Sequence, residues 1–278
     1  MRHWIWIILG LSLVFSPIAS GQNLRVMTYN IQHGQGVDGK VSLEESMAVI
    51  RAVDPDILLV NEVDVYWPRS GNVDQVSLLA KDLDYPYVYF APTLPGAFWQ
   101  RFTHRRYGNV LLSRLPLENP RSFLLPSLEE PRSLLVAEVT VDGETWHILG
   151  THLGLSTRDR ENQAAFIQQV AKGLSGPMVL LGDFNTPPDA PELSPLWTLF
   201  QEGHELVGVG EGMTFPSSGP TSRIDQFYLS PELVPHLTRI YTYPSATSGH
   251  LPVVAEFTLS NIRGVTPSHR TATHMTRH

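Results

Sequence analysis

Carboxylate, amide and imidazole side chains recur in this sequence where short apolar runs end. The most informative place follows the apolar run at residues 178–181, where Asp183 and Asn185 stand two residues apart. In a strand this spacing puts two side chains on the same face. A carboxylate can take a proton from water, and an amide beside it can hold an anion. Alone, the pair fits an Asx turn that closes a strand equally well, because Asp and Asn favour such turns.

Other carboxylate and imidazole groups stand at comparable places along the chain. Glu62 and His152 each follow a short apolar run and precede a loop. Asp225 lies in a strand-like stretch, where a buried carboxylate needs a partner. We expect that partner to be His250, which comes just before the last strand-like run. A lone histidine is more often structural, but the position of His152 repeats that of Glu62 and Asp183.

The expected elements that position these groups alternate between strands and helices. Ser42 with Glu45 three residues later is a capping-box pattern, and apolar residues at helical spacing continue it. Continuous apolar runs such as residues 57–60 predict strands that are covered on both faces. The other expected helices cover residues 73–83, 158–174 and 191–200.

Turn and loop signals separate the later elements. Asp142-Gly143 between two strand-like runs predicts a hairpin. Residues 91–106 combine prolines with aromatic and basic residues, and residues 203–222 are rich in Gly, Ser and Pro. We expect both segments to form loops beside the site. The aromatic residues of the first loop either contact substrate or pin the loop to the core.

The composition is that of a globular protein with a sizeable core. The chain has 278 residues, 42% of them hydrophobic, and a formal net charge of −7. No basic stripe runs along the sequence, so tight non-specific binding of DNA lacks electrostatic support. Acidic nucleases that use a metal keep a nuclease open as an alternative. The sequence shows no internal repeat and no linker, which predicts one domain over residues 22–260.

The two ends differ in composition from the rest. Arg2, an apolar run and several small residues form the pattern of a secretory signal over residues 1–21, with cleavage near Gly21. An uncleaved membrane anchor is the alternative, although the run is short for a full span. The polar residues 261–278 predict a disordered tail. Since the sequence has no cysteine, disulfides and thiol chemistry are excluded. Because of the signal pattern at residues 1–21, we expect an exported protein, periplasmic or extracellular.

Taken in order, the polar groups and the stretches around them resemble the endonuclease/exonuclease/phosphatase superfamily, also called the DNase I-like fold. Each matching stretch is weak alone, whereas the ordered set is specific and runs across nearly the whole chain after the signal. The matching stretches are residues 27–31, 60–63, 107–113, 150–153, 181–185, 223–225 and 248–252. No Rossmann glycine fingerprint, P-loop or nucleophile elbow competes with this resemblance.

The resemblance implies an α/β fold, a four-layer α/β/β/α sandwich of two packed mixed sheets flanked by helices. It also implies metal-dependent hydrolysis of phosphoester bonds. In such a site Glu62 ligates Mg²⁺ and Asn30 lies beside the metal, with Mn²⁺ or Ca²⁺ as alternatives. Hard Mg²⁺ prefers oxygen ligands and keeps several waters, so few protein carboxylates suffice.

The resemblance implies roles for five catalytic residues. Asp183 orients or deprotonates the attacking water, while Asn185 and His152 hold phosphate oxygens. Asp225 and His250 form a dyad, in which His250 acts on the phosphoryl group. Metal, amide and imidazole together would stabilise charge on the phosphoryl oxygens, the largest contribution in such catalysis.

Two further residues are candidates for substrate binding, and one position departs from the family's pattern. Arg132 and Asn109 are these candidates, while His33 lies near the site by position and is assigned no role. The departure is Gly249, because the family's last motif usually reads Ser-Asp-His and this chain has Ser-Gly-His. The missing carboxylate usually helps to hold the metal or its waters, so we expect weak metal binding. A positive φ angle at Gly249 would explain the glycine.

These features predict an exported, Mg²⁺-dependent phosphodiesterase or phosphatase. Its substrate is a lipid head group, a small phosphodiester or a nucleic acid, because fold alone does not choose among them. The acidic chain and the aromatic loop favour lipid or small substrates over duplex DNA. A secreted metal-dependent endonuclease or exonuclease is the alternative, and a binding protein on a catalytically weakened scaffold is a third. No obligate protein partner is implied, and we expect a monomer.

Overall fold

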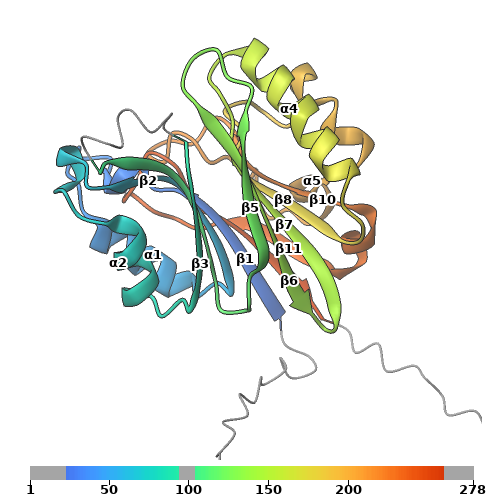
Figure 1. The fold of residues 1–278 in the computed structure, drawn as a ribbon, viewed down its shortest axis with the longest axis horizontal. Coiled ribbons are helices and arrows are strands. Elements are labelled where there is room, and N and C mark those ends of the chain that lie inside the picture. Colours follow the sequence, from blue (N-terminus) through green and yellow to red (C-terminus); the bar gives the residue numbers. More distant parts are fainter. Residues whose placement is uncertain (1–22, 94–103, 260–278) are drawn as a thin grey trace, which may run out of the picture.

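The computed structural model of the chain describes residues 23–93 and 104–259. Within these residues the chain forms two six-stranded mixed sheets with helices on their outer sides (Figure 1). This is the four-layer α/β/β/α sandwich expected from the sequence. The signal expected at residues 1–21, the tail expected at 261–278 and most of the loop expected at 91–106 lie outside the described residues.

The first sheet is built around a parallel pair of strands, β1 and β2. β12 pairs antiparallel with β1, and β4 pairs antiparallel with the other side of β2. The carboxyl ends of the parallel pair and the amino ends of its neighbours therefore meet at one edge. The strand order is β11-β12-β1-β2-β4-β3, with the bounds β1 Asn23–Asn30, β2 Ile57–Val65, β3 Tyr87–Pro92, β4 Arg106–Ser113, β11 Leu237–Thr242 and β12 Val253–Thr258.

The second sheet repeats this plan around the parallel pair β7 and β8. β6 pairs antiparallel with β7, and β10 pairs antiparallel with β8. The predicted hairpin at Asp142-Gly143 joins β6 to β7, and both residues have the positive φ angles (51° and 83°) of a type I′ turn. The strand order is β5-β6-β7-β8-β10-β9, with the bounds β5 Glu118–Leu125, β6 Arg132–Val141, β7 Glu144–His152, β8 Met178–Asp183, β9 Gln201–Glu202 and β10 Asp225–Leu229.

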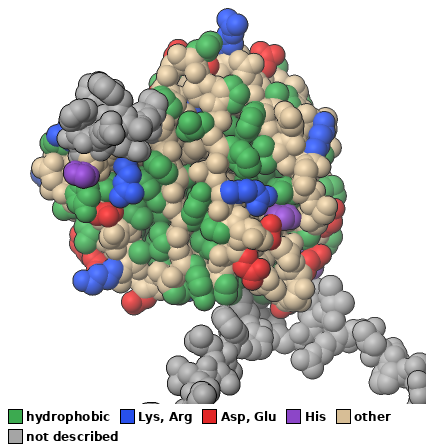
Figure 2. Space-filling view, in the orientation of Figure 1, with side chains coloured by type: hydrophobic (Ala, Val, Ile, Leu, Met, Phe, Trp, Pro, Cys, Tyr) green, Lys and Arg blue, Asp and Glu red, His purple; other side chains and the backbone are tan. Residues whose placement is uncertain are grey.

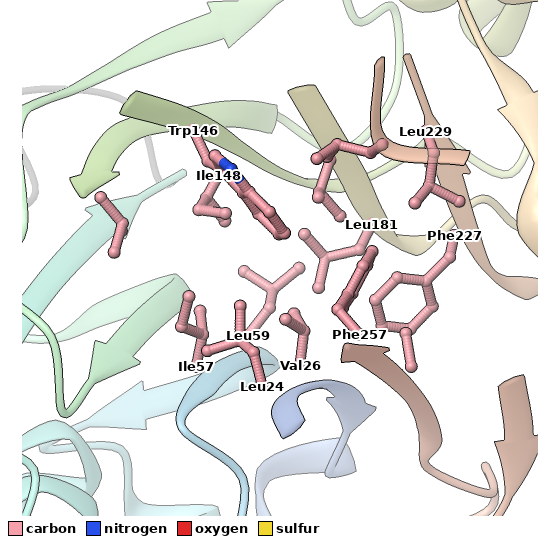
Figure 3. Close-up of a cluster of buried hydrophobic side chains, with 14 of the residues drawn as sticks. Leu24, Val26, Ile57, Leu59, Trp146, Ile148, Leu181, Phe227, Leu229 and Phe257 are labelled. Carbon is pink, nitrogen blue, oxygen red and sulfur yellow. The ribbon is translucent and has the colours of Figure 1, made fainter. Parts of the chain in front are cut away.

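Apolar side chains fill the space between the sheets (Figure 3). Leu59 of β2, Ile148 of β7 and Leu181 of β8 all point into this layer and are fully buried. Trp146 packs edge-on against Phe257, with ring centroids 5.3 Å apart. Because both central pairs are apolar on both faces, each sheet needs a helical cover on its outer side as well.

Helices supply that outer cover. α1 and α2 pack on the first sheet, and α4 packs on the second (Figure 1). Half of the predicted capping box is present, because the Ser42 side chain accepts a hydrogen bond from the Glu45 backbone at 3.3 Å, whereas the Ser42 backbone donates to the Gly34 carbonyl at 2.8 Å. The helices are α1 Leu43–Val53, α2 Gln75–Asp82, α4 Thr157–Lys172 and α5 Gly203–Val207, and the 3-10 turns are η1 Gln32–Gly34, η2 Pro68–Ser70, η3 Pro191–Leu193, η4 Leu196–Thr198 and η5 Pro231–His236.

Two of the sequence predictions about elements are wrong. The helix expected at residues 191–200 is instead the pair of 3-10 turns η3 and η4. Pro195 separates them, because its ring removes a backbone donor and would clash with the preceding turn of an α-helix. The loop expected at residues 203–222 begins with the short helix α5, whose first turn is capped by the Glu202 carboxylate.

The surface carries charges of both signs. In the view of Figure 2, acidic and basic side chains are interspersed with apolar and neutral ones, and no basic stripe crosses this face. Among residues 23–93 and 104–259, no helix is both long and apolar enough to cross a membrane.

Candidate active site

The predicted site residues come together at the edge where the strand ends of both sheets meet. In the second sheet Asp183 stands opposite His152 in the β7–β8 register and opposite Asp225 in the β8–β10 register. Gly182 makes this possible, because a Cβ atom there would lie 1.9 Å from the Thr151 carbonyl oxygen. Strand pairing alone therefore brings two carboxylates and an imidazole side by side.

Asp183 is the centre of the group. It is 1% exposed. Its Oδ2 accepts a hydrogen bond from Asn30 Nδ2 at 2.9 Å, and its Oδ1 accepts one from the Asn185 backbone at 2.9 Å. Burial and the nearby Asp225 carboxylate raise the pKa of Asp183 to about 6. A carboxylate with a raised pKa is better suited to accept a proton from water near neutral pH.

His250 and Asp225 form the predicted dyad. His250 Nδ1 lies 2.9 Å from Asp225 Oδ2, and Nε2 lies 3.8 Å from Asp183 Oδ2. Burial lowers the pKa of His250, but the carboxylates of Asp225 and Asp183 outweigh that effect and raise it to about 9. The ring therefore carries a positive charge at neutral pH. Ser248 holds this segment in place, because its hydroxyl donates to the Asn30 carbonyl and accepts from the His250 backbone.

His152 has the opposite electrostatic environment. Burial, the Arg132 guanidinium and His250 hold its pKa well below the usual value. Arg132 Nη1 lies 3.1 Å from His152 Nδ1, so the neutral ring accepts at Nδ1 and carries its proton on Nε2. That Nε2 lies 3.4 Å from Asp183 Oδ2. The site thus contains one neutral and one charged imidazole, each with an Nε2–H near the same carboxylate.

Glu62 supplies a more open carboxylate on the first sheet. The sequence places it just past a strand end, whereas β2 continues to Val65 and Glu62 lies at a register shift inside it. Its φ angle of 60° turns the side chain out of the normal alternation. Glu62 is half-buried, and its Oε1 accepts a hydrogen bond from Asn30 Nδ2 at 3.0 Å. The Asn30 amide nitrogen therefore donates to both the Glu62 and the Asp183 carboxylate and keeps the two close together.

The remaining predicted residues divide between the cavity and the layer beneath it. Asn185 and Arg132 line the cavity, and Asn185 is oriented by a bond from its Nδ2 to the Leu153 carbonyl at 2.9 Å. Asn109 is 1% exposed and does not line the cavity. Its Oδ1 accepts a bond at 2.9 Å from Asn61, which also donates to the Thr151 carbonyl of the other sheet. The structure therefore places Asn109 in a link between the sheets rather than at a substrate surface.

The Gly249 position is explained by a neighbouring side chain and not by backbone conformation. Gly249 lies outside the positive-φ region, so the expected conformational reason is wrong. A Cβ atom there would lie 2.7 Å from Gln32 Oε1, and the Gly249 backbone donates to that oxygen at 2.9 Å. Gln32 itself has a strained φ of 45°. The neutral amide of Gln32 thus occupies the space beside residue 249.

The site opens into a cavity of about 580 Å³, a size that suits a small ligand or one unit of a larger one. The sequence did not predict several residues of its wall, and most of these lie between strands rather than within them. The missed lining residues are Gln32, Trp67, Arg69, Tyr107, Glu130, Leu155, Phe215 and Ile224. Tyr107 and Ile224 lie within stretches that match the family pattern, and Trp67, Arg69 and Phe215 are aromatic or basic residues outside the strands.

The oxygen donors at this edge fit a hard divalent cation. Glu62 and Asp183 are carboxylates that accept from the same amide nitrogen, and a cation held by Glu62 would offset their mutual repulsion. A second group, formed by Asp183, Asp225 and His250, offers ligand atoms within 4.8 Å of one another. Asp225 Oδ1 is buried and has no hydrogen-bond partner among the described residues, so this oxygen has capacity for a further contact.

Comparison with known proteins agrees with this geometry. The model of the endonuclease/exonuclease/phosphatase family matches residues 27–258, which is most of the chain. The chain therefore belongs to this family, and the resemblance found in its motifs is confirmed.

Solved structures of the family have the same fold. An endonuclease/exonuclease/phosphatase from Beutenbergia cavernae is 27% identical, with a TM-score of 0.68, over 86% of this chain and 72% of that chain. A mannosyl-6-phosphatase from Bacteroides thetaiotaomicron is 18% identical, with a TM-score of 0.65, over 84% of this chain and 98% of that chain. Truncated TDP2 from Caenorhabditis elegans is 20% identical, with a TM-score of 0.64, over 86% of this chain and 99% of that chain. The last two similarities, at 18% and 20% identity, show a shared fold and nothing further.

Proposed function

We propose that this protein is an exported, Mg²⁺-dependent hydrolase of phosphoester bonds. The observation that carries the proposal is the environment of Asp183, a buried carboxylate with a raised pKa that two imidazole Nε2 atoms approach at 3.4 and 3.8 Å. A site of this kind can accept a proton on the carboxylate and donate hydrogen bonds to an anion beside it. Membership of the family supports phosphorus as the centre of the reaction.

Each protein group has a distinct task in this proposal. Asp183 takes the proton of the attacking water as the water oxygen bonds to phosphorus, and the bond from phosphorus to the ester oxygen breaks so that this oxygen leaves with its electron pair. The charged His250, held by Asp225, donates a hydrogen bond to a phosphoryl oxygen and offsets the charge that develops there. The neutral His152 donates from Nε2 to another phosphoryl oxygen, since Arg132 fixes its tautomer.

Glu62, with Asn30 beside it, would hold the metal, which when bound supplies positive charge to polarise the phosphoryl group. The preference for Mg²⁺ rests on the carboxylate oxygens of Glu62, which suit a hard cation, while Asn30 orients that carboxylate through its Nδ2. Mn²⁺ or Ca²⁺ would fit the same donors.

Hydrolysis by the purified mature protein tests this proposal. We expect turnover of a generic diester such as bis-p-nitrophenyl phosphate, and loss of turnover when a chelator removes the metal. Undiminished turnover after complete metal removal would contradict the mechanism. A panel of monoesters, lipid head-group esters and single-stranded DNA then distinguishes a phosphatase from the alternative, a secreted nuclease. Failure of every class with Mg²⁺, Mn²⁺ and Ca²⁺ would favour a binding protein on this scaffold.

Export is the second part of the proposal, and it rests on the signal pattern of residues 1–21. We expect the protein from its native compartment to begin near Gln22. N-terminal sequencing decides this, because an intact Met1 in a membrane fraction would identify an anchor instead. Mass measurement under native conditions tests the expectation of a monomer.

A further inference from the structure

A further cationic group lies in the wall of the active-site cavity, and the mechanism above does not use it. Arg69 lines the same cavity as Glu62 and His250. Its side chain is 45% exposed, so part of it is accessible to a ligand. The position of this group is set by Asp64, which follows Glu62 by two residues on β2.

Asp64 holds Arg69 in one orientation. Arg69 Nε and Nη2 donate to the two carboxylate oxygens of Asp64, each at 2.8 Å. Asp64 is fully buried, and the Ser70 hydroxyl also donates to it, at 2.9 Å. Two parallel bonds fix the plane of a guanidinium as well as its place. Arg69 Nη1 has no acceptor among the described residues.

Aromatic rings and a second arginine surround this guanidinium. The Arg69 guanidinium carbon lies 5.2 Å from the ring centroid of Trp67 and 5.3 Å from that of Tyr107. Arg105 also approaches Trp67, at 5.7 Å. Trp67 is fixed in turn by a bond from its Nε1 to the Arg106 carbonyl at 2.9 Å. Two guanidinium groups therefore lie against one indole, and Trp67 and Arg69 both line the cavity. Because hydrogen bonds already hold Trp67 and Arg69, these two side chains have little entropy left to lose on binding.

We propose that Arg69, Trp67 and Arg105 form a subsite for a second phosphate group of the substrate, beside the phosphate that is hydrolysed. This inference rests on the proposed function, because it assigns the substrate of the same cavity. A guanidinium held by one edge offers its other donor to an anionic oxygen, and phosphate matches that geometry. Two sources carry such a group: the neighbouring phosphate of a polynucleotide strand, and the second phosphate of a small bisphosphate.

Paired substrates that differ by one phosphate distinguish the two sources. One pair is a thymidine dinucleotide with and without a 5′-phosphate, and the other is ribose 1,5-bisphosphate with ribose 5-phosphate. For at least one pair we expect the wild-type KM to be at least about tenfold lower for the member with the extra phosphate, the scale of a charge-assisted hydrogen bond. Preference in the first pair alone identifies a strand, and preference in the second alone identifies a small bisphosphate.

Variants then assign the preference to Arg69. Arg69→Gln should remove the preference while KM for the member with a single phosphate changes less than about twofold. Arg69→Lys should keep part of the preference for the extra phosphate, because lysine retains the positive charge but lacks the paired donors of a guanidinium. Arg51→Gln is the matched control, since Arg51 pairs with the exposed Glu44 on α1 and does not line this cavity. A purely structural Arg69 would change both members of a pair equally.

Loss of Arg69 leaves the buried Asp64 carboxylate with one partner fewer, so folding needs its own control. The double variant Asp64→Asn with Arg69→Gln removes both charges together. Arg105→Gln removes the second guanidinium, for which no carboxylate partner lies among the described residues. Thermal unfolding checks that each variant is folded before its KM values are compared.

Two outcomes overturn the subsite: equal KM values within both pairs in the wild type, or an unchanged preference in the folded Arg69 variants. If no substrate is hydrolysed at all, the proposed function fails on its own. Calorimetric titration of the same paired compounds into wild type and Arg69→Gln, with Mg²⁺ present, then still tests the subsite by the same tenfold criterion.

Discussion

The two sheets offer the same arrangement of strand ends at one edge, yet they surround their polar groups differently. Each sheet has a parallel pair at its centre, β1–β2 in the first and β7–β8 in the second, with antiparallel neighbours on both sides. Asn30 ends β1 as His152 ends β7. Glu62 and Asp183 then occupy related places near the ends of β2 and β8.

The difference lies in solvent access and charge. Asp183 and Asp225 on the second sheet are each 1% exposed, and burial raises the pKa of Asp183 to about 6. Glu62 on the first sheet is half-buried and is turned toward the cavity at a register shift. In our proposal the second sheet therefore carries proton transfer, for which a shifted pKa is useful. The first sheet carries metal binding, for which an accessible charged oxygen is useful.

The largest expected effect comes from the second sheet. Asp183→Ala and His250→Ala should each lower kcat by at least ~100-fold, the scale for a general base or a group that stabilises an oxyanion. Because these variants lose a group that acts on water or on the phosphoryl group and keep Glu62, which would hold the metal, excess Mg²⁺ should not restore the rate. Steady-state kinetics over a Mg²⁺ series measures this. Glu144→Gln, exposed at the far end of β7, is the control and should retain the wild-type rate.

The matching change on the first sheet should behave differently. Glu62→Gln keeps the size of the side chain and removes its charge. We expect the Mg²⁺ concentration for half-maximal activity to rise by about 10- to 100-fold, with activity partly restored at high Mg²⁺. If the Mg²⁺ concentration for half-maximal activity is unchanged in Glu62→Gln, the assignment of metal binding to the first sheet is contradicted.

A smaller effect is expected where the chain departs from its relatives. Gly249→Asp adds a carboxylate beside His250, and it requires Gln32 to move, because the new Cβ would lie 2.7 Å from Gln32 Oε1. The paired variant Gly249→Asp with Gln32→Ala provides the room. We expect it to lower the Mg²⁺ midpoint by up to about tenfold relative to Gln32→Ala alone. An unchanged midpoint in the folded double variant would mean that a carboxylate at this position has no part in holding the metal.

The burial of Asp183 should also be visible in stability. A carboxyl group whose folded pKa of about 6 exceeds its unfolded value destabilises the fold when ionised. The destabilisation is absent below the unfolded pKa, grows as pH rises and is complete above about 6. Asp183→Asn should therefore raise the free energy of unfolding at pH 8 by about 1–3 kcal/mol, and much less at pH 4. Denaturant unfolding with chelator present measures this, and equal stability at pH 8 would contradict it.

The sequence predicted best those features that depend on strand ends. Asp183, His152 and Asp225 follow or begin apolar runs, and strand register alone then brings them together. The family resemblance predicted the two packed sheets and the Asp225–His250 pair, in which His250 Nδ1 lies 2.9 Å from Asp225 Oδ2. These predictions depended on local pattern and on the right overall fold.

Features that depend on side chains from distant segments could not be read in this way. Gln32 and Gly249 are separated by 217 residues, so nothing local shows that one fills the space beside the other. In the sequence Asn109 is a polar residue beside an apolar run, which made it a candidate for substrate binding. In the structure it accepts a hydrogen bond from Asn61 of another strand and lies beneath the cavity. Arg69 is held at the cavity by the buried Asp64, and no local pattern in the sequence shows that these two side chains pair.

The dependence of kcat/KM on pH tests the central claim most directly, because it reports the two groups of the second sheet in the free enzyme. Asp183 must be ionised to accept a proton, so the rate should rise with pH through about 6. His250 must be protonated, so the rate should fall as pH rises through about 9. We expect a bell-shaped profile with these two limbs, and bound Mg²⁺ should move the acidic limb to lower pH, because a nearby cation lowers the pKa of a carboxyl group. A profile that is flat between pH 5 and pH 10 would contradict the claim that these two groups carry proton transfer and charge stabilisation.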